Sequence, residues 1–318
     1  MRILFLGASE LGWECCRALL DAGEPVVGIV TVPREFKISW SPGGVTNVRY
    51  RSFDDLAAGH RIPLLTMTKK MSDPALVQAV EDLRPDLMVV IGWYHLLPAS
   101  FRAIAKLGAV GIHGSLLPRY RGGAPLVWAV IEGETRTGVT LFHLADGVDD
   151  GDVVAQADFA IDPDDEIADV IAKATRASVD VATRFVPLLG AGTAPRRRQD
   201  ETLATSVPQR RPEDGLLDWS RHGVATARNW IRAQSRPYPG AFTFADGERM
   251  TIWRAHVLDA AAPSSPPGSL SIQRDGLVAV SCADGGLLAL DEVEKGGQVS
   301  SGSAVRGATG AATRLATS

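Results

Sequence analysis

The stretch "DLMVVIGWYHLLPASFRAIAKLGAVGIHG", residues 86–114, decides the fold class. Residues 86–92 form a continuous apolar run that ends in Gly, and residues 109–114 repeat this pattern. Residues 98–106, which begin with Pro, predict a short helix between the two runs. Strands that are apolar along their whole length are typical of parallel sheets whose two faces are covered by helices. The stretch therefore predicts a strand–helix–strand unit of an α/β sheet.

The same alternation extends on both sides of this unit. It predicts a doubly wound, Rossmann-like parallel sheet in an N-terminal domain over residues 1–190. Residues 33–52 interrupt the alternation and predict a loop, because they are polar and contain "SPGG". The other predicted strands are 2–7, 25–32, 137–145 and 151–161, and the other predicted helices are 9–23, 72–84, 124–134 and 165–190.

The composition changes after residue 190. Residues 191–215 are polar, basic and contain Pro, which predicts a linker. Residues 216–318 then hold a predicted helix at 218–234 and short strand-like pieces that are separated by Gly, Pro and Asp. Such a pattern is typical of a small β-barrel. We therefore expect a smaller, OB-like C-terminal barrel domain, and we expect its Gly-, Ser- and Ala-rich end from residue 297 to be frayed.

The composition excludes several classes of protein. The net charge of −4 gives no overall attraction to nucleic acid or to a membrane surface. No apolar run approaches the length of a membrane span, and the start of the chain does not resemble a signal peptide, so we expect a cytoplasmic protein. The three Cys are not spaced like metal ligands, and we expect small buried thiols and no metal.

The first strand–helix turn, "GASELG" (7–12), is weak evidence for a nucleotide. It lacks the full glycine pattern of a dinucleotide-binding turn and the Lys of a phosphate-binding loop. A tight turn is enough to explain its glycines.

His113 is the strongest candidate for chemistry, because it stands at the end of the strand 109–114. Doubly wound sheets bind their ligands beyond the carboxyl ends of the strands. We expect the strand 137–145 to run parallel to 109–114, so that the acidic loop after it brings Asp149 to His113. A carboxylate beside an imidazole fixes its tautomer and raises its pKa, which suits acid–base catalysis near neutral pH. A structural His and a solvated acidic turn are the alternatives.

Two longer motifs resemble the folate-dependent formyltransferases. The first is "IHGSLLPRYRGGAP" (112–125), which is followed by "GETRTGVTLFHLADGVDDGDVVAQ" (133–156). The second is "GLLDWS" (215–220) with "RNWIRAQSRPYPGAFTF" (228–244), and it resembles the start of the C-terminal domain of methionyl-tRNA and sugar-nucleotide formyltransferases. The resemblance covers most of the chain. It implies an enzyme of one-carbon metabolism that transfers a formyl group from N10-formyltetrahydrofolate to an amine.

The resemblance also implies residue roles. The catalytic trio of the family is Asn, His and Asp, which fall on Gly111, His113 and Asp149. In the family, Asn and protonated His donate hydrogen bonds to the oxygen of the tetrahedral intermediate, and loss of one such donor typically costs about 10²- to 10³-fold in rate. We expect Gly111 to leave a space of the size of an Asn side chain, filled by water or by the acceptor.

Two groups of binding residues complete the expected site. The resemblance implies a pteridine pocket formed by two loops, and we expect the basic turn after His113 to contact the acceptor. The pocket residues are Trp93, Tyr94, His95, Leu96 and Leu97 with Gly147, Val148 and Asp149, and the acceptor contacts are Ser115, Arg119, Tyr120, Arg121 and Gly122.

The charge of the C-terminal region bears on the acceptor. Residues 206–318 hold 12 Lys and Arg against 11 Asp and Glu, whereas the rest of the chain holds 21 against 26. A tRNA-binding protein is expected to present a strongly basic face. We therefore expect a small amine acceptor, such as an amino sugar nucleotide or an amino-acid-like compound. A methionyl-tRNA formyltransferase is the alternative, and a folate-binding homologue with altered or lost transfer activity is the second alternative, because of Gly111.

Overall fold

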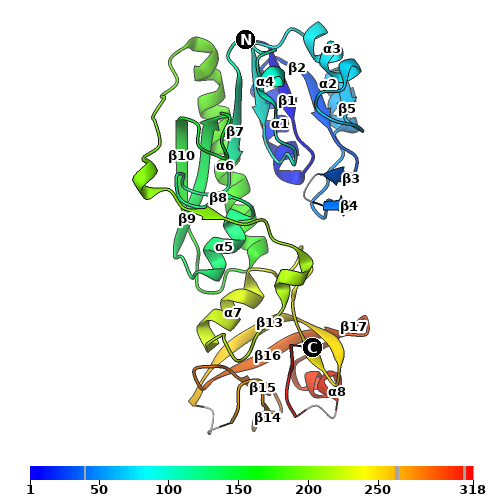
Figure 1. Ribbon diagram of the computed structural model, residues 1–318, viewed down its shortest axis with the longest axis vertical. Helices are drawn as coiled ribbons and strands as arrows, with labels where there is room; N and C mark the ends of the chain where they lie inside the picture. Colours follow the sequence, from blue (N-terminus) through cyan, green and yellow to red (C-terminus); the bar gives the residue numbers. More distant parts are fainter. Residues whose placement is uncertain (39–40, 262–264, 311–312, 318) are drawn as a thin grey trace. The chain divides into compact units, whose positions relative to one another are not determined.

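The structure of the protein is a computed structural model that describes residues 1–318 except 39–40, 262–264, 311–312 and 318 (Figure 1). The chain divides into two compact units. Unit 1 comprises Met1–Pro125, Arg136–Phe159 and Ala172–Val207, and unit 2 comprises Leu126–Thr135, Ala160–Ile171 and Pro208–Ser318. The domain limits that we drew from sequence, at residues 190 and 216, stay a prediction.

Unit 1 is built on a seven-stranded sheet in the order β10-β9-β7-β6-β1-β2-β5. The five neighbouring strands β7, β6, β1, β2 and β5 are parallel, and β9 is antiparallel to β7. Figure 1 shows helices α1 to α4 around the parallel strands, which is the expected Rossmann-like arrangement. The strands are β1 (Ile3–Leu6), β2 (Val26–Thr31), β5 (Leu64–Thr66), β6 (Leu87–Val90), β7 (Ala109–His113), β9 (Arg136–His143) and β10 (Val153–Ala160). The helices are α1 (Glu10–Asp21), α2 (Asp54–His60), α3 (Pro74–Asp82) and α4 (Ala99–Arg102). Helix α5 (Pro125–Ile131) falls in unit 2 except for its first residue, and α6 (Ile167–Ala191) belongs to unit 2 up to Ile171 and to unit 1 from Ala172.

The turn between β1 and α1 owes its glycine to close packing. Ser9 caps α1 by accepting a hydrogen bond from the backbone N–H of Gly12. A Cβ atom on Gly12 would lie 2.4 Å from the carbonyl oxygen of Ile91, so only Gly allows α1 to approach the end of β6 this closely. The turn therefore needs its glycine for packing, and no nucleotide is required to explain it.

The segment 33–52 contains a hairpin, so the prediction of a loop was wrong. Strands β3 (Glu35–Ile38) and β4 (Ser41–Thr46) pair in antiparallel fashion. The sequence misled because "SPGG", which usually marks a turn, lies within β4. The side chain of Asn47 after the hairpin is buried and donates to the carbonyl oxygen of Ala8, which ties the hairpin to the end of β1.

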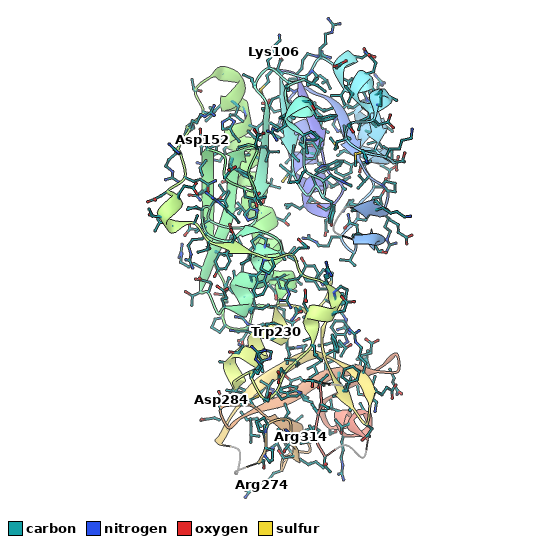
Figure 2. The ribbon with its side chains drawn as sticks, in the orientation of Figure 1. Lys106, Asp152, Trp230, Arg274, Asp284 and Arg314 are labelled. Carbon is teal, nitrogen blue, oxygen red and sulfur yellow. The ribbon has the colours of Figure 1, made fainter. Side chains whose placement is uncertain are left out.

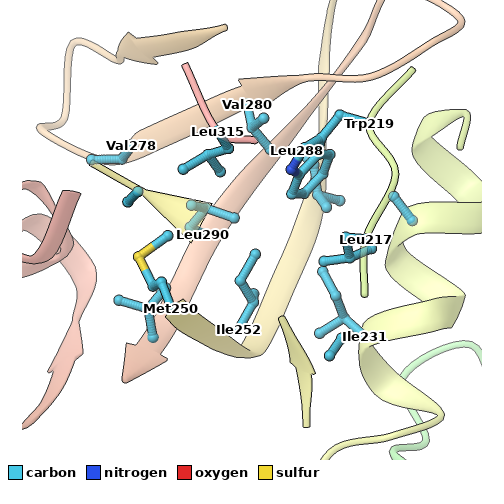
Figure 3. Close-up of a cluster of buried hydrophobic side chains, with 14 of the residues drawn as sticks. Leu217, Trp219, Ile231, Met250, Ile252, Val278, Val280, Leu288, Leu290 and Leu315 are labelled. Atoms are coloured by element: carbon cyan, nitrogen blue, oxygen red, sulfur yellow. The ribbon is translucent and has the colours of Figure 1, made fainter. Parts of the chain in front are cut away.

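Unit 2 contains an antiparallel sheet in the order β12-β13-β16-β15-β14, with β17 paired to β16. Its core is a cluster of buried apolar side chains, to which helix α7 (Val224–Arg232) contributes Ile231 (Figure 3). This helix is shorter than the predicted 218–234, because residues 219–221 form a turn. The strands are β12 (Ala241–Ala245), β13 (Glu248–Ala261), β14 (Leu270–Ile272), β15 (Val278–Ser281), β16 (Gly286–Lys295) and β17 (Gln298–Ser301).

Described residues near the end of the chain pair with this sheet, so the prediction of a frayed end is wrong for them, whereas residues 311–312 and 318 lie outside the described residues. The backbone N–H of Phe244, in β12, donates to the carbonyl of Ala316 at 3.0 Å, and the N–H of Leu270, in β14, donates to the carbonyl of Thr313 at 2.9 Å. Leu315 and Val305, which begins helix α8 (Val305–Thr309), are buried in the core. Residues 313–316 therefore pair with both edges of the sheet, although the composition of the segment suggests disorder.

Three further findings concern the described residues only. None of the helices among them is long and apolar enough to span a membrane. No three His, Cys, Asp or Glu side chains among them form a cluster that could hold a metal ion. The thiols of Cys15, Cys16 and Cys282 are free and buried, and burial raises the pKa of Cys282 to about 12.

Candidate active site

His113 lies at the end of β7 with both ring nitrogens facing oxygen atoms. Its Nε2 atom lies 2.7 Å from the backbone carbonyl oxygen of Tyr120, which can only accept, so Nε2 carries a proton. Its Nδ1 atom lies 3.5 Å from Oδ2 of Asp149. The bond that orients the ring therefore comes from the Tyr120 carbonyl, and not from the carboxylate as we expected. Asp149 faces the other ring nitrogen, Nδ1, so a group bound at this point lies within reach of both side chains.

Asp149 is held in an unusual backbone conformation. Its φ is +53°, in the left-handed region that Asp and Asn tolerate better than most residues. Its Oδ2 atom accepts a hydrogen bond of 2.9 Å from the backbone N–H of Gly122. The carboxylate is thus fixed by the turn that follows His113.

The route by which Asp149 reaches His113 differs from our expectation. We expected β9 to run parallel to β7, and this was wrong, because the strands are antiparallel and His113 pairs with Thr140 while Val110 pairs with His143. The loop after β9 therefore leaves at the start of β7 and folds back across the face of that strand. The proximity of the two side chains is present, but the loop conformation creates it.

The space beside Gly111 is not empty, which corrects our expectation of an Asn-sized gap. Gly111 is buried in β7, and a Cβ atom there would lie 3.0 Å from Cδ2 of Leu144 and 3.2 Å from the carbonyl oxygen of Val90. Leu144 is the first residue of the folded-back loop. Its side chain fills the position toward which an Asn at 111 would point.

The loop 93–97 carries two polar ring atoms without partners. Nε1 of Trp93 and Nε2 of His95 are buried and have no hydrogen-bond partner. Burial lowers the pKa of His95, so its ring is neutral at neutral pH and offers one donor and one acceptor. Tyr94 donates to Oδ1 of Asn47 at 2.8 Å. Leu97 is buried, whereas Leu96 is 83% exposed.

Arg102 connects the two loops of the expected pteridine pocket, and the sequence did not single it out. Its guanidinium donates to the carbonyl oxygen of Leu97 at 2.7 Å and forms an ion pair with Asp146. Asp146 directly precedes the predicted pocket residues Gly147 and Val148, of which Val148 is 57% exposed. The two loops that the sequence assigned to one pocket are therefore linked by one side chain.

Side-chain hydrogen bonds of Ser115 and Arg121 stabilise the turn after His113. The Ser115 hydroxyl is buried and donates to the carbonyl of Arg119 at 2.6 Å. Arg121 is 9% exposed and donates to Gln199 and Glu201. The hydrogen bond from Arg121 lowers the pKa of Glu201. Contacts of Ser115, Arg119, Tyr120, Arg121 and Gly122 with an acceptor stay a prediction.

Gln199 is the second site residue that sequence reasoning missed. It lies in the segment 191–215, which we predicted as a linker from its polar composition. The residue is 6% exposed, and its side chain reaches the loop that holds Asp149. No pattern of spacing in the segment distinguishes it from its polar neighbours.

The chain matches two family models. Residues 42–185 match the family described as formyl transferase, and residues 210–307 match the formyl transferase C-terminal domain. Among curated relatives, the methionyl-tRNA formyltransferase of Geotalea uraniireducens (strain Rf4) is 35% identical over 298 residues, which is 94% of this chain and 91% of the relative. That of Geobacter sulfurreducens is 36% identical over 289 residues, 91% of this chain and 87% of the relative.

Solved structures share the fold. WlaRD, a sugar 3N-formyl transferase solved in the presence of dTDP and 5-N-formyl-THF, has a TM-score of 0.64 at 14% identity, over 94% of this chain and 98% of its own. HypX from Aquifex aeolicus in complex with tetrahydrofolic acid has a TM-score of 0.62 at 20% identity, over 97% of this chain. This chain spans about half the length of HypX, at 47% of that chain.

Proposed function

This chain belongs to the formyl transferase family, and we propose that it transfers a formyl group from N10-formyltetrahydrofolate to the α-amino group of methionyl-tRNA. One observation carries the choice of acceptor. Identity of 35% to a curated methionyl-tRNA formyltransferase extends over 94% of this chain. The relatives therefore support our alternative acceptor better than the small amine that the charge balance favoured.

The residues of the two linked loops fit a folate donor. Trp93 Nε1 and His95 Nε2 are buried without partners, and buried polar atoms of this kind are rare in folded proteins. A pteridine, with its ring nitrogens and carbonyl oxygen, offers partners to such groups. Structural neighbours that were solved with tetrahydrofolic acid or 5-N-formyl-THF support this choice of donor.

The pair His113–Asp149 suits the chemistry of formyl transfer. The amine nitrogen bonds to the formyl carbon, the carbonyl oxygen takes the negative charge, and the bond from carbon to N10 then breaks. His113, when protonated at Nδ1, donates toward that oxygen, while Asp149 accepts the proton that the amine loses. The amine loses one proton and N10 gains one when the bond breaks, so the reaction balances without a further reactant.

The test of this function is a formylation assay with purified chain. We expect N10-formyltetrahydrofolate and methionyl-tRNA to yield formylmethionyl-tRNA and tetrahydrofolate, with kcat/KM falling steeply as salt rises. Calorimetry with 5-formyltetrahydrofolate should show binding in the same preparation. Absence of folate binding at millimolar ligand would refute the proposal at the donor, and binding without formylation of tRNA would refute the acceptor.

A small amine is the second candidate, and the charge of residues 206–318 favours it. This region has 12 basic against 11 acidic side chains, which is a weak attraction for a polyanion. A panel of amino sugar nucleotides and amino acids, run beside methionyl-tRNA with release of tetrahydrofolate as the readout, separates the two. Turnover of a panel member at a kcat/KM that exceeds that of the tRNA would reverse the order of the candidates.

Replacing Gly111 by Asn should not restore a stronger site. The Asn side chain must displace Leu144 at 3.0 Å and press on the Val90 carbonyl at 3.2 Å, and such overpacking typically costs about 1–3 kcal/mol of stability. We expect kcat/KM of Gly111→Asn to rise by less than about tenfold or to fall, although a well-placed oxyanion donor supplies roughly 10²-fold.

Two further variants separate crowding from hydrogen bonding at this position. Gly111→Ala adds only the Cβ atom, and Gly111→Asn with Leu144→Ala gives the amide the space that Leu144 fills. Thermal unfolding and kcat/KM are measured for each. A hundredfold rise in kcat/KM for Gly111→Asn alone would show that the site lacks only its hydrogen-bond donor and that the Leu144 side chain moves aside at little cost.

A further inference from the structure

The side-chain amide of Gln199 uses all of its hydrogen-bonding groups on two elements of the site. Its Nε2 atom donates to the backbone carbonyls of Asp149 at 2.8 Å and Gly151 at 2.7 Å. Its Oε1 atom accepts from Nε of Arg121 at 3.2 Å and from Nη2 at 2.8 Å. A primary amide has two N–H donors and two acceptor positions, so this buried group is fully satisfied.

Arg121 determines which way the amide points. Its guanidinium can only donate, so it holds Oε1 of Gln199 on its own side and turns both N–H groups toward the loop. Glu201 binds the other edge of the guanidinium with two bonds, of 2.9 Å to Nη1 and 2.8 Å to Nη2. A continuous chain of bonds thus runs from Glu201 to the backbone of Asp149.

The same segment also supports the other half of the pair. The Thr205 hydroxyl accepts from the backbone N–H of Tyr120 at 2.8 Å, and the Tyr120 carbonyl orients His113. Strand β11 (Ser206–Val207) pairs with β8 (Arg121–Gly122). Arg196 forms an ion pair of 2.7 Å with Asp152, which Figure 2 labels beside β10. Residues 196–207 therefore contact both sides of the candidate centre.

We propose that Gln199 is a positioning residue for Asp149: it fixes the left-handed backbone of that residue and so keeps the carboxylate beside His113. Asp149 carries φ +53° without being Gly, and a residue in this region persists only when its surroundings hold it there. The two bonds from Gln199 bracket it, one on its own carbonyl and one two residues later. This proposal rests on the proposed function for its kinetic consequence but not for its structural one.

The test compares Gln199→Glu with Gln199→Met. Glu keeps the length and the bond to Arg121 but replaces both donors with acceptors, and Met removes every hydrogen bond without adding charge. We expect kcat for formyl transfer to fall roughly 10- to 100-fold in either variant, since small misplacements of a reacting group have effects of that size. In an Asp149→Asn background the same changes should lower kcat by less than about a further threefold. Gln199 is proposed to act through Asp149, and residues that act as a unit have non-additive effects.

A second measurement does not depend on any acceptor. The ¹⁵N shifts of the His113 ring, assigned by their loss in His113→Ala, should move in Gln199→Met in the same direction as in Asp149→Asn. Gln273→Glu, an isosteric change in unit 2, is the matched control and should move neither shift nor rate.

The outcomes separate this proposal from the proposed function. Unchanged His113 shifts in both Gln199 variants would overturn the positioning role, whatever the acceptor. If the Gln199 variants lowered kcat by the same factor in the Asp149→Asn background as in the wild type, the positioning role would be overturned as well, in favour of a general structural role. Moved shifts together with an inactive wild-type protein would support the positioning role and reject the proposed function alone.

Discussion

His113→Ala should lower kcat/KM for formyl transfer by roughly 10²- to 10⁴-fold, the range that positioned acid–base groups contribute. The ring is the one group of the pair that can donate toward a developing oxyanion, and its Nε2 is already committed to the Tyr120 carbonyl at 2.7 Å. Ala leaves that carbonyl and the Asp149 carboxylate without their shared partner. The measurement is steady-state formylation of methionyl-tRNA over a range of donor concentrations.

A structural role for His113 predicts a different result. The side chain is 10% exposed and ties β7 to the turn at Tyr120, so Ala also removes a packing contact. His113→Gln keeps a side chain that can donate to the Tyr120 carbonyl, and it should recover thermal stability without recovering rate. If His113→Ala lost only stability, and the folded fraction transferred formyl at the wild-type rate, His113 would have no catalytic part.

The sequence predicted the pairing of His113 and Asp149 for a reason that was partly wrong. Apolar runs specify that β7 and β9 are strands, but direction is set by how the chain connects them. The connection from β7 to β9 spans residues 114–135 and contains strand β8 (Arg121–Gly122) and the seven-residue helix α5 (Pro125–Ile131), and β9 returns antiparallel to β7. The loop that follows then reaches His113 by folding back. Neither direction nor loop path is encoded in hydrophobic periodicity.

The contacts that hold the site were beyond the reach of the sequence. Gln199 and Arg102 act through backbone carbonyls of residues 50 and 5 positions away, and such partners leave no local pattern. The packing of Leu144 against Gly111 is also of this kind, because it brings a strand residue next to a loop residue 33 positions later. The fold class was predictable because burial repeats along the chain, whereas these contacts depend on the finished fold.

Asp149→Asn should lower kcat/KM by a similar factor, roughly 10²- to 10⁴-fold, with little change in the fold. Asn tolerates the left-handed φ of +53° as well as Asp does, and its side-chain oxygen can still accept from the Gly122 N–H. The variant therefore removes the negative charge that faces His113 at 3.5 Å and leaves the rest of the contact in place. Thermal unfolding within a few degrees of wild type is the check that the loop is intact.

The double variant decides whether the two side chains act together. In the proposed mechanism His113 serves the oxygen and Asp149 accepts the amine proton, so each side chain has its own task and the losses of the two single variants should largely multiply in the double variant. An additional loss of less than about threefold for Asp149→Asn after His113→Ala would instead show that Asp149 acts only through the His113 ring. Asp149→Ala adds a check on the backbone, because Ala tolerates the left-handed region less well than Asn. A larger loss for Ala than for Asn would then measure how much of the rate depends on the loop conformation that Gln199 and Gly122 hold.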